Sequence, residues 1–469
     1  MKHRLLLVGL VALASMAAVA VVGTAGAKSG DDRHKRSYEV WLIDQEDKLN
    51  AGVGTLHVFD GEELADRARS ADPESIDLGG AVRALCETET GSTPSRPHML
   101  VFNGGDDDGP GGNTHAVIAY VASGHVAFLD AATREPVACI DVGVQAHAAW
   151  PTPDQRHLIV ANQNGKLLNR IATDYEDEVF TLDGAATLDL ANCTTPSGAP
   201  CQDPALRPDN APICPRTTSD GAFTFVTLRG GGMFVVDHNT TPMRIVAEYT
   251  REHVDDNGCG EMEVRGKMYL NSGAGLTAPS VPGDEPYGHD VYAVELSELS
   301  ATPATTPNTP PAKLVYTRDG RGEREAGGGP GAEGPRDGGP GTAELDAHAV
   351  ALTRRGRYLW WGDRSQNDVT VVDPRRDRVV ARFDLDNRHS DDPAPDLFDL
   401  APRGDFMFAS LRGPNPSSGH EAYGSTPGVG VIEVRRGGRG GRLVGVARVG
   451  SVRGTPDPHA VRVRNLGGG

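Results

Sequence analysis

The chain has 469 residues, of which 59 are glycine and 33 are proline, and its formal net charge is −18. A chain this long is too large for most single compact cores, but a repeat-built fold accommodates it. The acidic balance excludes nucleic-acid binding as a main function, because that function needs a basic surface. Short apolar runs alternate with turn residues, and no long 3.6-residue periodicity is present. We therefore expect an all-β protein built from many short strands.

The first 27 residues have the order of a secretory signal peptide. A basic start precedes an almost wholly apolar run from Leu5 to Val22, and the small residues Ala25-Gly26-Ala27 follow. We expect cleavage after Ala27, an exported chain in the periplasm or outside the cell, and no stable membrane insertion. The alternative is a membrane anchor, because the apolar run is about as long as a spanning helix needs. Residues 28–37 are polar, and we expect a flexible lead there.

Residues 38–469 are predicted to form one seven-bladed β-propeller. The runs Tyr38–Ile43, Gly54–Asp60 and Ser75–Leu78 supply only three strands of a four-stranded blade. A fourth, inner strand is available at the other end of the chain, in His459–Arg464. A C-terminal strand that pairs with N-terminal strands removes the open edge of a circular propeller. We therefore expect the ring to close in this way.

A short unit recurs along the chain and marks the start of blades. Its clearest copy is Gln145–Asp154 followed by Leu158–Asn162, in which a histidine opens a small-residue strand before a turn and a second apolar strand. A second copy begins at Asp346. The Gly-, Glu- and Arg-rich stretch 318–343 cannot bury a core, so we expect a disordered loop there. Third strands end in an aspartate before a turn, as short hairpin connections favour, at Asp60, Asp130, Asp237 and Asp373.

Aligned on their first turns, these units place histidines and one aspartate at equivalent positions. The innermost strands of a propeller line its central channel and begin at one mouth, so these side chains should form part of a ring there. Zinc takes imidazole and carboxylate ligands, and copper or nickel would accept the same imidazoles. The alternatives are inherited packing and a metal-free ligand or catalytic site. The predicted metal ligands are His98, His147, His348, His459 and Asp396.

Six cysteines are compatible with disulfides in an exported protein. Cys193 and Cys201 bracket a short loop and are the easiest local pair. Cys214 and Cys259 fall six residues before the turn position in neighbouring blades. We expect a disulfide between them, with two thiolate metal ligands as the alternative. Cys86 precedes one blade and Cys139 lies in its last strand.

Turn residues on the histidine side of the ring are weaker candidates. His125 follows Ser123-Gly124 in such a turn and is a secondary candidate for the metal site, together with the two cysteines 214 and 259. No Gly-x-Ser-x-Gly elbow supports serine catalysis, and no Cys-x-x-Cys-His motif supports haem attachment. Other turn residues could support the ligands from behind or gate the mouth, although solvated turns are the simpler expectation. These are Arg229, Asp363, Arg364, Arg412 and His420.

The pattern resembles the extracytoplasmic seven-bladed propellers whose blades carry a Tyr-Val-Thr-Asn type of repeat. The His-Ala starts, the Pro-Asp turns and Ile159-Val160-Ala161-Asn162 carry this resemblance over nearly all of residues 38–466. The chain also resembles the periplasmic propeller metallochaperones that hand zinc to the solute-binding protein of a zinc ABC importer. That second resemblance rests on Thr114–Val117, Gly124–Asp130, Gln145–Ala148, Ala161–Lys166 and the later channel histidines.

The resemblance implies zinc bound by channel histidines and an aspartate, which by position are the five residues named above. Neutral imidazoles would hold the ion, and protonation or a partner's ligands would release it. We accordingly expect a monomeric metallochaperone that is not an enzyme and whose partner is the solute-binding protein of a zinc ABC transporter. The main alternative is a metal-dependent propeller enzyme of the lactonase, hydrolase or oxidase type, which needs an open coordination position. A metal-free interaction scaffold is the third.

Overall fold

The computed structural model describes residues 37–45, 52–105, 113–255, 258–272, 289–301, 308–319, 322–325, 345–416, 423–450 and 456–466. All of these lie in one compact unit, Arg36–Gly469, while a separate unit, Met1–Lys35, has no described residue. The expected signal peptide and nearly all of the expected flexible lead therefore lie outside the described residues.

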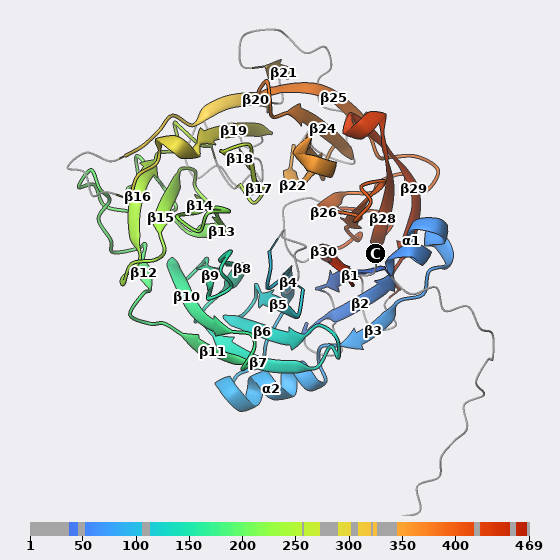
Figure 1. The fold of residues 1–469 in the computed structure, drawn as a ribbon, viewed down its shortest axis with the longest axis horizontal. Helices are drawn as coiled ribbons and strands as arrows, with labels where there is room; N and C mark the ends of the chain where they lie inside the picture. The colour runs from blue at the N-terminus through green and yellow to red at the C-terminus, as the bar shows by residue number, and fades with distance from the viewer. Residues whose placement is uncertain are drawn as a thin grey trace, which may run out of the picture. The chain divides into compact units, whose positions relative to one another are not determined.

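Seven antiparallel sheets surround a central channel, which confirms the predicted propeller (Figure 1). The first two complete blades are β4 (Pro97–Phe102), β5 (His115–Tyr120), β6 (His125–Asp130) and β7 (Pro136–Asp141), then β8 (Ala146–Pro151), β9 (His157–Asn162), β10 (Leu167–Asp174), β11 (Val179–Leu182) and β12 (Leu188–Asp189). The next two are β13 (Pro212–Thr217), β14 (Thr224–Leu228), β15 (Met233–Asp237) and β16 (Arg244–Tyr249), then β17 (Glu261–Val264), β18 (Lys267–Ser272), β19 (Asp290–Glu295), β20 (Lys313–Asp319) and β21 (Gly322–Glu325). Two more are β22 (Ala347–Leu352), β23 (Leu359–Asp363), β24 (Asp368–Asp373) and β25 (Arg378–Asp384), then β26 (Pro395–Leu400), β27 (Phe406–Leu411), β28 (Gly428–Arg435) and β29 (Gly440–Arg448).

The seventh blade joins the two ends of the described chain, as predicted. Its strand order is β3-β2-β1-β30, with β1 (Tyr38–Asp44), β2 (Thr55–Asp60), β3 (Glu74–Asp77) and β30 (Pro458–Asn465). Strand β30 is the inner strand and pairs antiparallel with β1, for example Trp41 with Arg462. The open edge that each end would otherwise present is thereby paired.

The strand-ending aspartates cap the turns that follow them. The Asp130 carboxylate accepts a hydrogen bond from the Ala132 N–H at 3.0 Å, and the Asp373 carboxylate accepts one from the Arg375 N–H at 3.0 Å. Asp60 instead caps helix α1 (Gly61–Arg67), because its carboxylate accepts from the N–H groups of both Glu62 and Glu63. The same side-chain chemistry thus begins a turn in some blades and a helix in another.

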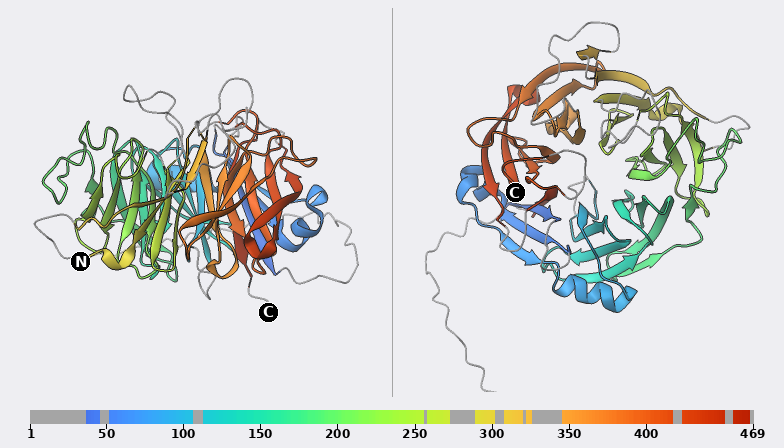
Figure 2. Two further views of the ribbon diagram at one scale, coloured as in Figure 1. Left: turned by 90° about the horizontal axis from the view of Figure 1, so that it is seen from above. Right: turned by 180° about the vertical axis from the view of Figure 1, so that it is seen from behind.

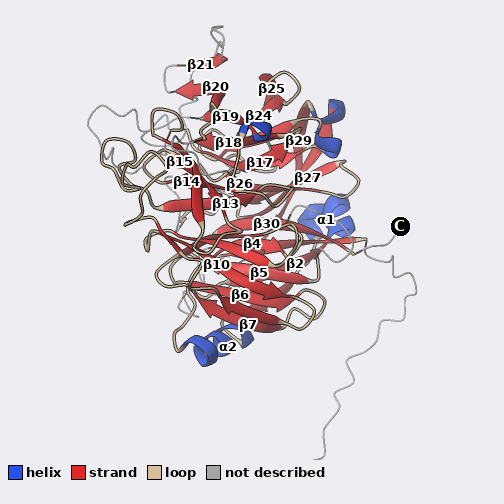
Figure 3. Cartoon of the chain, turned by 60° about the vertical axis from the view of Figure 1, so that its left-hand side comes forward, coloured by secondary structure: helices blue, strands red, loops and turns tan. Residues whose placement is uncertain are grey.

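A second helix, α2 (Ala81–Thr90), was not expected from the sequence. Only Val82 and Cys86 of this helix are buried, so its apolar face is a single turn long and too short to stand out in the sequence. It lies against the outer strand β7, where a disulfide joins Cys86 to Cys139 (Figure 3). None of the helices among the described residues is long and apolar enough to cross a membrane.

The blades are held in place by apolar layers between their faces. The strands run between the two faces of the ring (Figure 2, left). Neighbouring residues of a strand point to opposite sides of its sheet, so Trp361 packs with Tyr269 of the preceding blade while Trp360 packs with Phe398 of the next. Strand β23 is therefore packed on both faces, which fixes the position of the inner strand β22 that pairs with it.

Two further expectations concern the loops and cysteines. The expected disordered loop 318–343 begins at the end of β20, and β21 occupies 322–325, while residues 326–344 lie outside the described residues. The predicted disulfides Cys193–Cys201 and Cys214–Cys259 are both present, with Cys86–Cys139 as a third. Three disulfides indicate an oxidising, extracytoplasmic location.

Candidate functional site in the central channel

Irregularities at the start of the inner strands turn the candidate residues into the channel. The pairing of β4 with β5 shifts between Pro97 and Met99, and the pairing of β22 with β23 shifts between Ala347 and Ala349. A bulge of this kind re-aims the side chain that it contains. The same shift is found in β8, β13, β26 and β30. The bulged segments contain His98, His147, Cys214, His348, Asp396 and His459.

The four predicted histidines meet in a continuous row. The ring centroids of His98 and His459 are 3.6 Å apart, those of His98 and His147 are 4.7 Å apart, and those of His348 and His459 are 5.6 Å apart. Asp396 lies beside this row, with its carboxylate oxygens 3.5 Å from Nε2 of His348 and 3.6 Å from Nε2 of His459. The sequence alignment of the blades therefore brought these five side chains into the channel, while their role as metal ligands stays a prediction.

Three of the imidazoles are fixed in one tautomer, because Nδ1 of each ring faces a carbonyl or amide oxygen. Nδ1 of His459 donates to the carbonyl of His98 at 2.8 Å, and Nδ1 of His147 donates to the carbonyl of Ile213 at 2.9 Å. Nδ1 of His98 lies 3.0 Å from the amide oxygen of Gln45. A carbonyl oxygen only accepts, so the proton is on Nδ1 and the lone pair is on Nε2. Metal-binding histidines in proteins are supported in this way.

His348 differs from the other three. Both of its ring nitrogens are buried and have no hydrogen-bond partner. A buried polar group without a partner costs free energy, so a bound ion or a water at His348 would stabilise it. His348 and His459 offer Nε2 and Asp396 offers a carboxylate oxygen, and one ligand atom from each lies within 4.8 Å of the others. We call these three residues the acidic group.

Asp396 is the centre of a buried ladder of charges. Its two oxygens accept from Arg364 Nη1 at 2.9 Å and from Arg412 Nη1 at 2.7 Å. Arg364 also binds both oxygens of Asp346, and Arg412 binds both oxygens of Asp457. The ladder spans three consecutive blades and contains three carboxylates and two guanidiniums. Its extra negative charge suits a bound cation.

The two arginines correct a prediction. We expected Arg364 and Arg412 in solvated turns, but both are fully buried and hold Asp396 from behind. The structure places both guanidiniums against Asp396, where they fix the orientation of its carboxylate. The sequence signal was available in the repeated Asp-x-His pattern of Asp346 with His348 and of Asp457 with His459, since each of these aspartates needs a buried cation as partner.

Burial keeps the histidines neutral. It lowers the pKa of His147 to about 4 and the pKa of His459 to about 3, and for both residues it is the largest cause. The pKa values of His98 and His348 are also lowered, first by burial, and then by the neighbouring histidines for His98 and by Arg364 for His348. Burial alone would raise the pKa of Asp396, but His459 and the two arginines hold it below its usual value. At neutral pH the site therefore offers free imidazole lone pairs beside a carboxylate.

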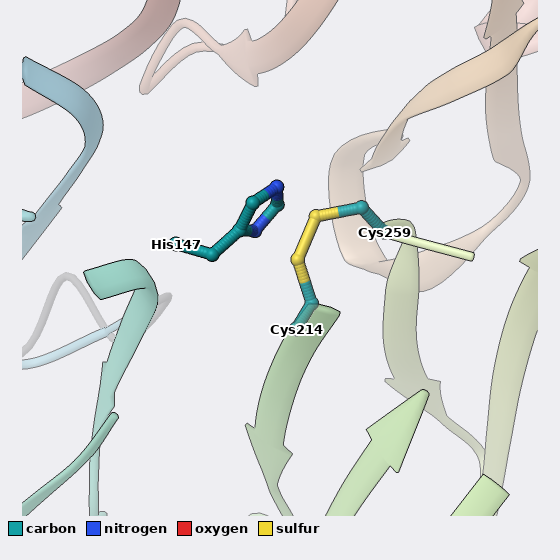
Figure 4. A group of neighbouring side chains, drawn as sticks. All are labelled: His147, Cys214 and Cys259. Carbon is teal, nitrogen blue, oxygen red and sulfur yellow. A yellow bond between two sulfur atoms is a disulfide. The ribbon is translucent and has the colours of Figure 1, made fainter. Parts of the chain in front are cut away.

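His147 belongs to a second group on the other side of the channel. It faces the Cys214–Cys259 disulfide (Figure 4), and one ring nitrogen and the two sulfur atoms lie within 4.8 Å of one another. We call these three residues the sulfur group. Both cysteines are oxidised here, so the predicted disulfide is confirmed and the alternative of two thiolate ligands does not describe this state.

His125 does not reach the channel. Its Nδ1 lies 2.9 Å from the Ser123 hydroxyl, and its Nε2 lies 3.0 Å from the hydroxyls of Thr90 and Ser92 at the end of α2. This places it among the groups that fasten the helix to its blade. The turn before β6 therefore faces α2 and not the ring.

The channel continues beyond the ring into a cavity of about 40 Å³. Two guanidiniums lie over the Trp150 ring there, with Arg216 4.0 Å and Arg462 5.2 Å from its centroid. Glu261 lines the same cavity, and one of its carboxyl oxygens lies 3.0 Å from the Thr227 hydroxyl, whose own proton goes to the Gly258 carbonyl. Burial raises the pKa of Glu261 to about 8, so it carries a proton at neutral pH. No sequence motif marked Glu261, because its importance depends only on burial.

No protein-family model matches the sequence, and no curated protein matches it. Solved structures do share the fold. A protein from Lactobacillus plantarum superposes with a TM-score of 0.56 at 12% identity, over 91% of this chain and 99% of that one. The periplasmic gluconolactonase of Pseudomonas aeruginosa has a TM-score of 0.54 at 14% identity, over 91% and 98%. A candidate 6-phosphogluconolactonase from Bacteroides uniformis has a TM-score of 0.54 at 13% identity, over 91% and 99%.

These neighbours contradict our expectation that the protein is not an enzyme. Structures that share the fold over nine-tenths of the chain are named as lactonases, and none of those described above is named as a zinc chaperone. At identities of 12–14% the likeness itself establishes the seven-bladed fold. The physical reason for the wrong prediction is that a ring of channel histidines serves binding and catalysis equally well, so the ligand set alone does not separate the two.

Proposed function

We propose that the protein is an exported, metal-dependent hydrolase that opens a lactone or a related ester at the mouth of the propeller channel. The observation that carries this proposal is the acidic group. His348, His459 and Asp396 offer three converging ligand atoms, and three protein ligands with one open position is the arrangement of catalytic zinc sites. Zinc is the ion that these ligands suit best, and copper would accept the same imidazoles. Such an ion, when bound, polarises an ester carbonyl and activates water.

The protein's own residues would hold and orient the reacting groups. Burial keeps the imidazoles of His348 and His459 unprotonated at neutral pH, so that their lone pairs stay available. The two arginines keep the Asp396 carboxylate in one orientation and ionised. His98 stacks on His459, which limits rotation of that ring, and the His98 carbonyl holds the proton on His459 Nδ1.

The cavity behind the ring has the groups that ring opening needs. Glu261 carries a proton at neutral pH and can donate it to an alkoxide leaving group. Arg216 and Arg462, held over Trp150, can accept the carboxylate that hydrolysis produces. A cavity of about 40 Å³ admits only the reacting ester group and water, so the remainder of the substrate would lie at the mouth.

The test is hydrolysis of gluconolactone by the zinc-loaded protein, followed by acid release at constant pH. We expect turnover that a chelator abolishes and that His348→Ala reduces at least about 100-fold. His125→Ala is the matched control, because that histidine lies away from the channel and its loss should leave turnover unchanged. Equal turnover of the chelated and zinc-loaded proteins would exclude the proposal.

A second candidate is capture of zinc and its delivery to the solute-binding protein of a metal ABC importer. The small cavity favours it, since a site of this size suits an ion better than a sugar. The fixed tautomers of three histidines also suit a tight ion site. Transfer of zinc from the loaded protein to such a binding protein, faster than zinc dissociates from the loaded protein alone, would support delivery. A rate no faster than spontaneous release would exclude it.

Export of the mature chain after cleavage at Ala27 belongs to the same proposal. It is supported by the three disulfides and by the order of charges and apolar residues at the N-terminus. N-terminal sequencing of the secreted protein would test it, with Lys28 expected as the first residue.

A further inference from the structure

We propose that the Cys214–Cys259 disulfide is the oxidised, closed form of a second metal site, which His147 completes and which binds a thiophilic ion such as Zn²⁺ or Cu⁺ when the disulfide is reduced. This site is separate from the acidic group and does not depend on the proposed hydrolase. It would make the sulfur side of the channel a metal site that is controlled by the redox state.

The first support is the convergence of three ligand atoms. One ring nitrogen of His147 and the two sulfur atoms lie within 4.8 Å of one another (Figure 4). Because Nδ1 of His147 donates to the Ile213 carbonyl, Nε2 carries the free lone pair. Ile213 is the residue before Cys214, so the imidazole and one sulfur atom are tied to the same point of β13. Two thiolates and one imidazole are ligands that zinc and cuprous copper prefer.

The second support is that the other half of the site is held without the disulfide. Cys259 lies between two glycines that pack on Asn271, and the Gly260 N–H donates to the Asn271 side chain at 2.7 Å. A Cβ on Gly258 would lie 1.8 Å from the Asn271 carbonyl oxygen, so only glycine fits there. The Gly258 carbonyl also accepts a hydrogen bond from Thr227. These contacts would keep Cys259 in place after the S–S bond opens.

The third support is access. Both cysteines line the channel cavity, and His147 is only half-buried, whereas His98, His348 and His459 are buried. The sulfur atoms therefore face a cavity that is large enough for an ion or for water. Among the residues that the structure describes, neither Cys86–Cys139 nor Cys193–Cys201 has a third ligand residue at such a distance. A histidine close to both sulfur atoms is thus found at only one of the three disulfides of the described chain.

The redox step is thiol–disulfide exchange. A thiolate of a dithiol reductant attacks one sulfur, which forms a mixed disulfide and releases the other cysteine as a thiolate. The second thiol of the reductant then resolves the mixed disulfide, so that two electrons pass to the protein and the reductant leaves oxidised. Binding of the ion releases any thiol protons to solvent. Reoxidation by a disulfide oxidant would reverse these steps and expel the ion.

The test uses Co²⁺ as the probe, because thiolate ligation of cobalt produces charge-transfer absorption in the near ultraviolet. We expect the purified full chain to show no such absorption when oxidised, and to bind one thiolate-ligated equivalent after reduction with a dithiol. Cys214→Ala/Cys259→Ala should abolish the signal, whereas the matched control Cys193→Ala/Cys201→Ala should retain it. His147→Ala should weaken cobalt binding about tenfold or more. The signal should persist in His348→Ala, so that failure of the acidic group is distinguished from failure of this site.

A measurement on the unaltered chain keeps the proposal testable if a cysteine variant fails to fold. Bound Zn²⁺ should protect Cys214 and Cys259 of the reduced protein from alkylation, while Cys193 and Cys201 are labelled at an unchanged rate. Three results would overturn the proposal. These are equal labelling of all four thiols with and without zinc, a cobalt signal that survives in Cys214→Ala/Cys259→Ala, and a disulfide that is reduced only when the propeller unfolds.

Discussion

The two sides of the channel ring occupy the same positions in the repeat but differ in chemistry. The acidic group and the sulfur group both use side chains from the bulged starts of inner strands. The acidic group is buried and lies on a ladder of five charged residues. In the sulfur group only His147 is partly exposed, and the two buried cysteines are joined by a covalent bond. The same β-bulge therefore turns a side chain into the channel on both sides. The residues around that side chain then determine whether it is free to bind a ligand.

The residue that follows the second strand of a blade accounts for much of the difference in charge between the acidic group and the sulfur group. Arg364 and Arg412 stand at that position on the acidic side and turn into the channel toward Asp396. Arg229 follows β14 on the sulfur side, but it binds Asp209 at 2.6 Å and Asn164 at 2.9 Å. No inward arginine stands at this position on the sulfur side of the described chain, and a disulfide lies where the acidic side has its carboxylate.

The largest expected effect comes from breaking the charge ladder. Asp396→Ala leaves two buried guanidiniums without the carboxylate that they share, so the free energy of unfolding should fall by about 3–5 kcal/mol. Chemical denaturation measures this. Glu433→Ala is the matched control, since it removes the exposed Arg435 pair and should cost less than about 1 kcal/mol. Equal costs for the two variants would show that the ladder contributes no more than a surface pair.

Removing the disulfide of the sulfur group should have the next largest effect. It closes a chain segment with a sequence separation of 45, against 8 for Cys193–Cys201. Chain entropy then predicts losses of about 4 and about 2.5 kcal/mol for the two paired Cys→Ala variants. Chemical denaturation of both variants under identical conditions shows which variant loses more free energy of unfolding. A reversed order would mean that strain or unfolded-state structure dominates.

A smaller effect is expected from Glu261, which lines the cavity behind the ring together with Cys214 and Cys259. Its pKa is raised from 4.5 to about 8 in the folded protein, first by burial. The unfolded chain therefore holds fewer protons between these values, so this residue's contribution to stability is complete below pH 4.5 and is lost as pH rises to about 8. Stability should fall by about 1.4 kcal/mol per pH unit relative to Glu261→Gln between pH 6 and 8.

Urea titrations of the two proteins across this range measure the slope. Glu263→Gln is the matched control, because Glu263 lies on the same strand but is less buried and accepts from Ser219 at the surface. If the free energies of unfolding of the unaltered chain and of Glu261→Gln changed in parallel with pH, Glu261 would not be protonated in the folded protein.

The smallest effect should be that of His348→Leu on the metal-free protein. Both nitrogens of His348 are buried without partners, so a residue of similar size should change the free energy of unfolding by less than about 1 kcal/mol. The same variant should lose metal binding, which calorimetric titration with zinc would show. A loss of several kcal/mol without metal would indicate that the imidazole serves packing, which was one of the alternatives from the sequence.

Much of the architecture could be predicted from interactions between residues that are close in the sequence. Aspartates that end a strand and cap the next turn, as at Asp130 and Asp373, repeat because each needs only its own neighbouring N–H groups. The closing strand was also predictable, since an unpaired edge at each end of the chain demands a partner. Helix α2 was not predictable, because a disulfide and contacts with β7 hold it in place of an apolar stripe.

The sequence by itself determined which residues reach the ring, because equivalent positions in repeated blades point to one channel. It did not determine that His348, His459 and Asp396 converge while His147 joins the cysteines. Nor did it determine that Arg364 and Arg412 are buried, or that Glu261 holds a proton. Those outcomes depend on distances across the channel and on exclusion of water, and both arise only when seven separate sheets close around one axis.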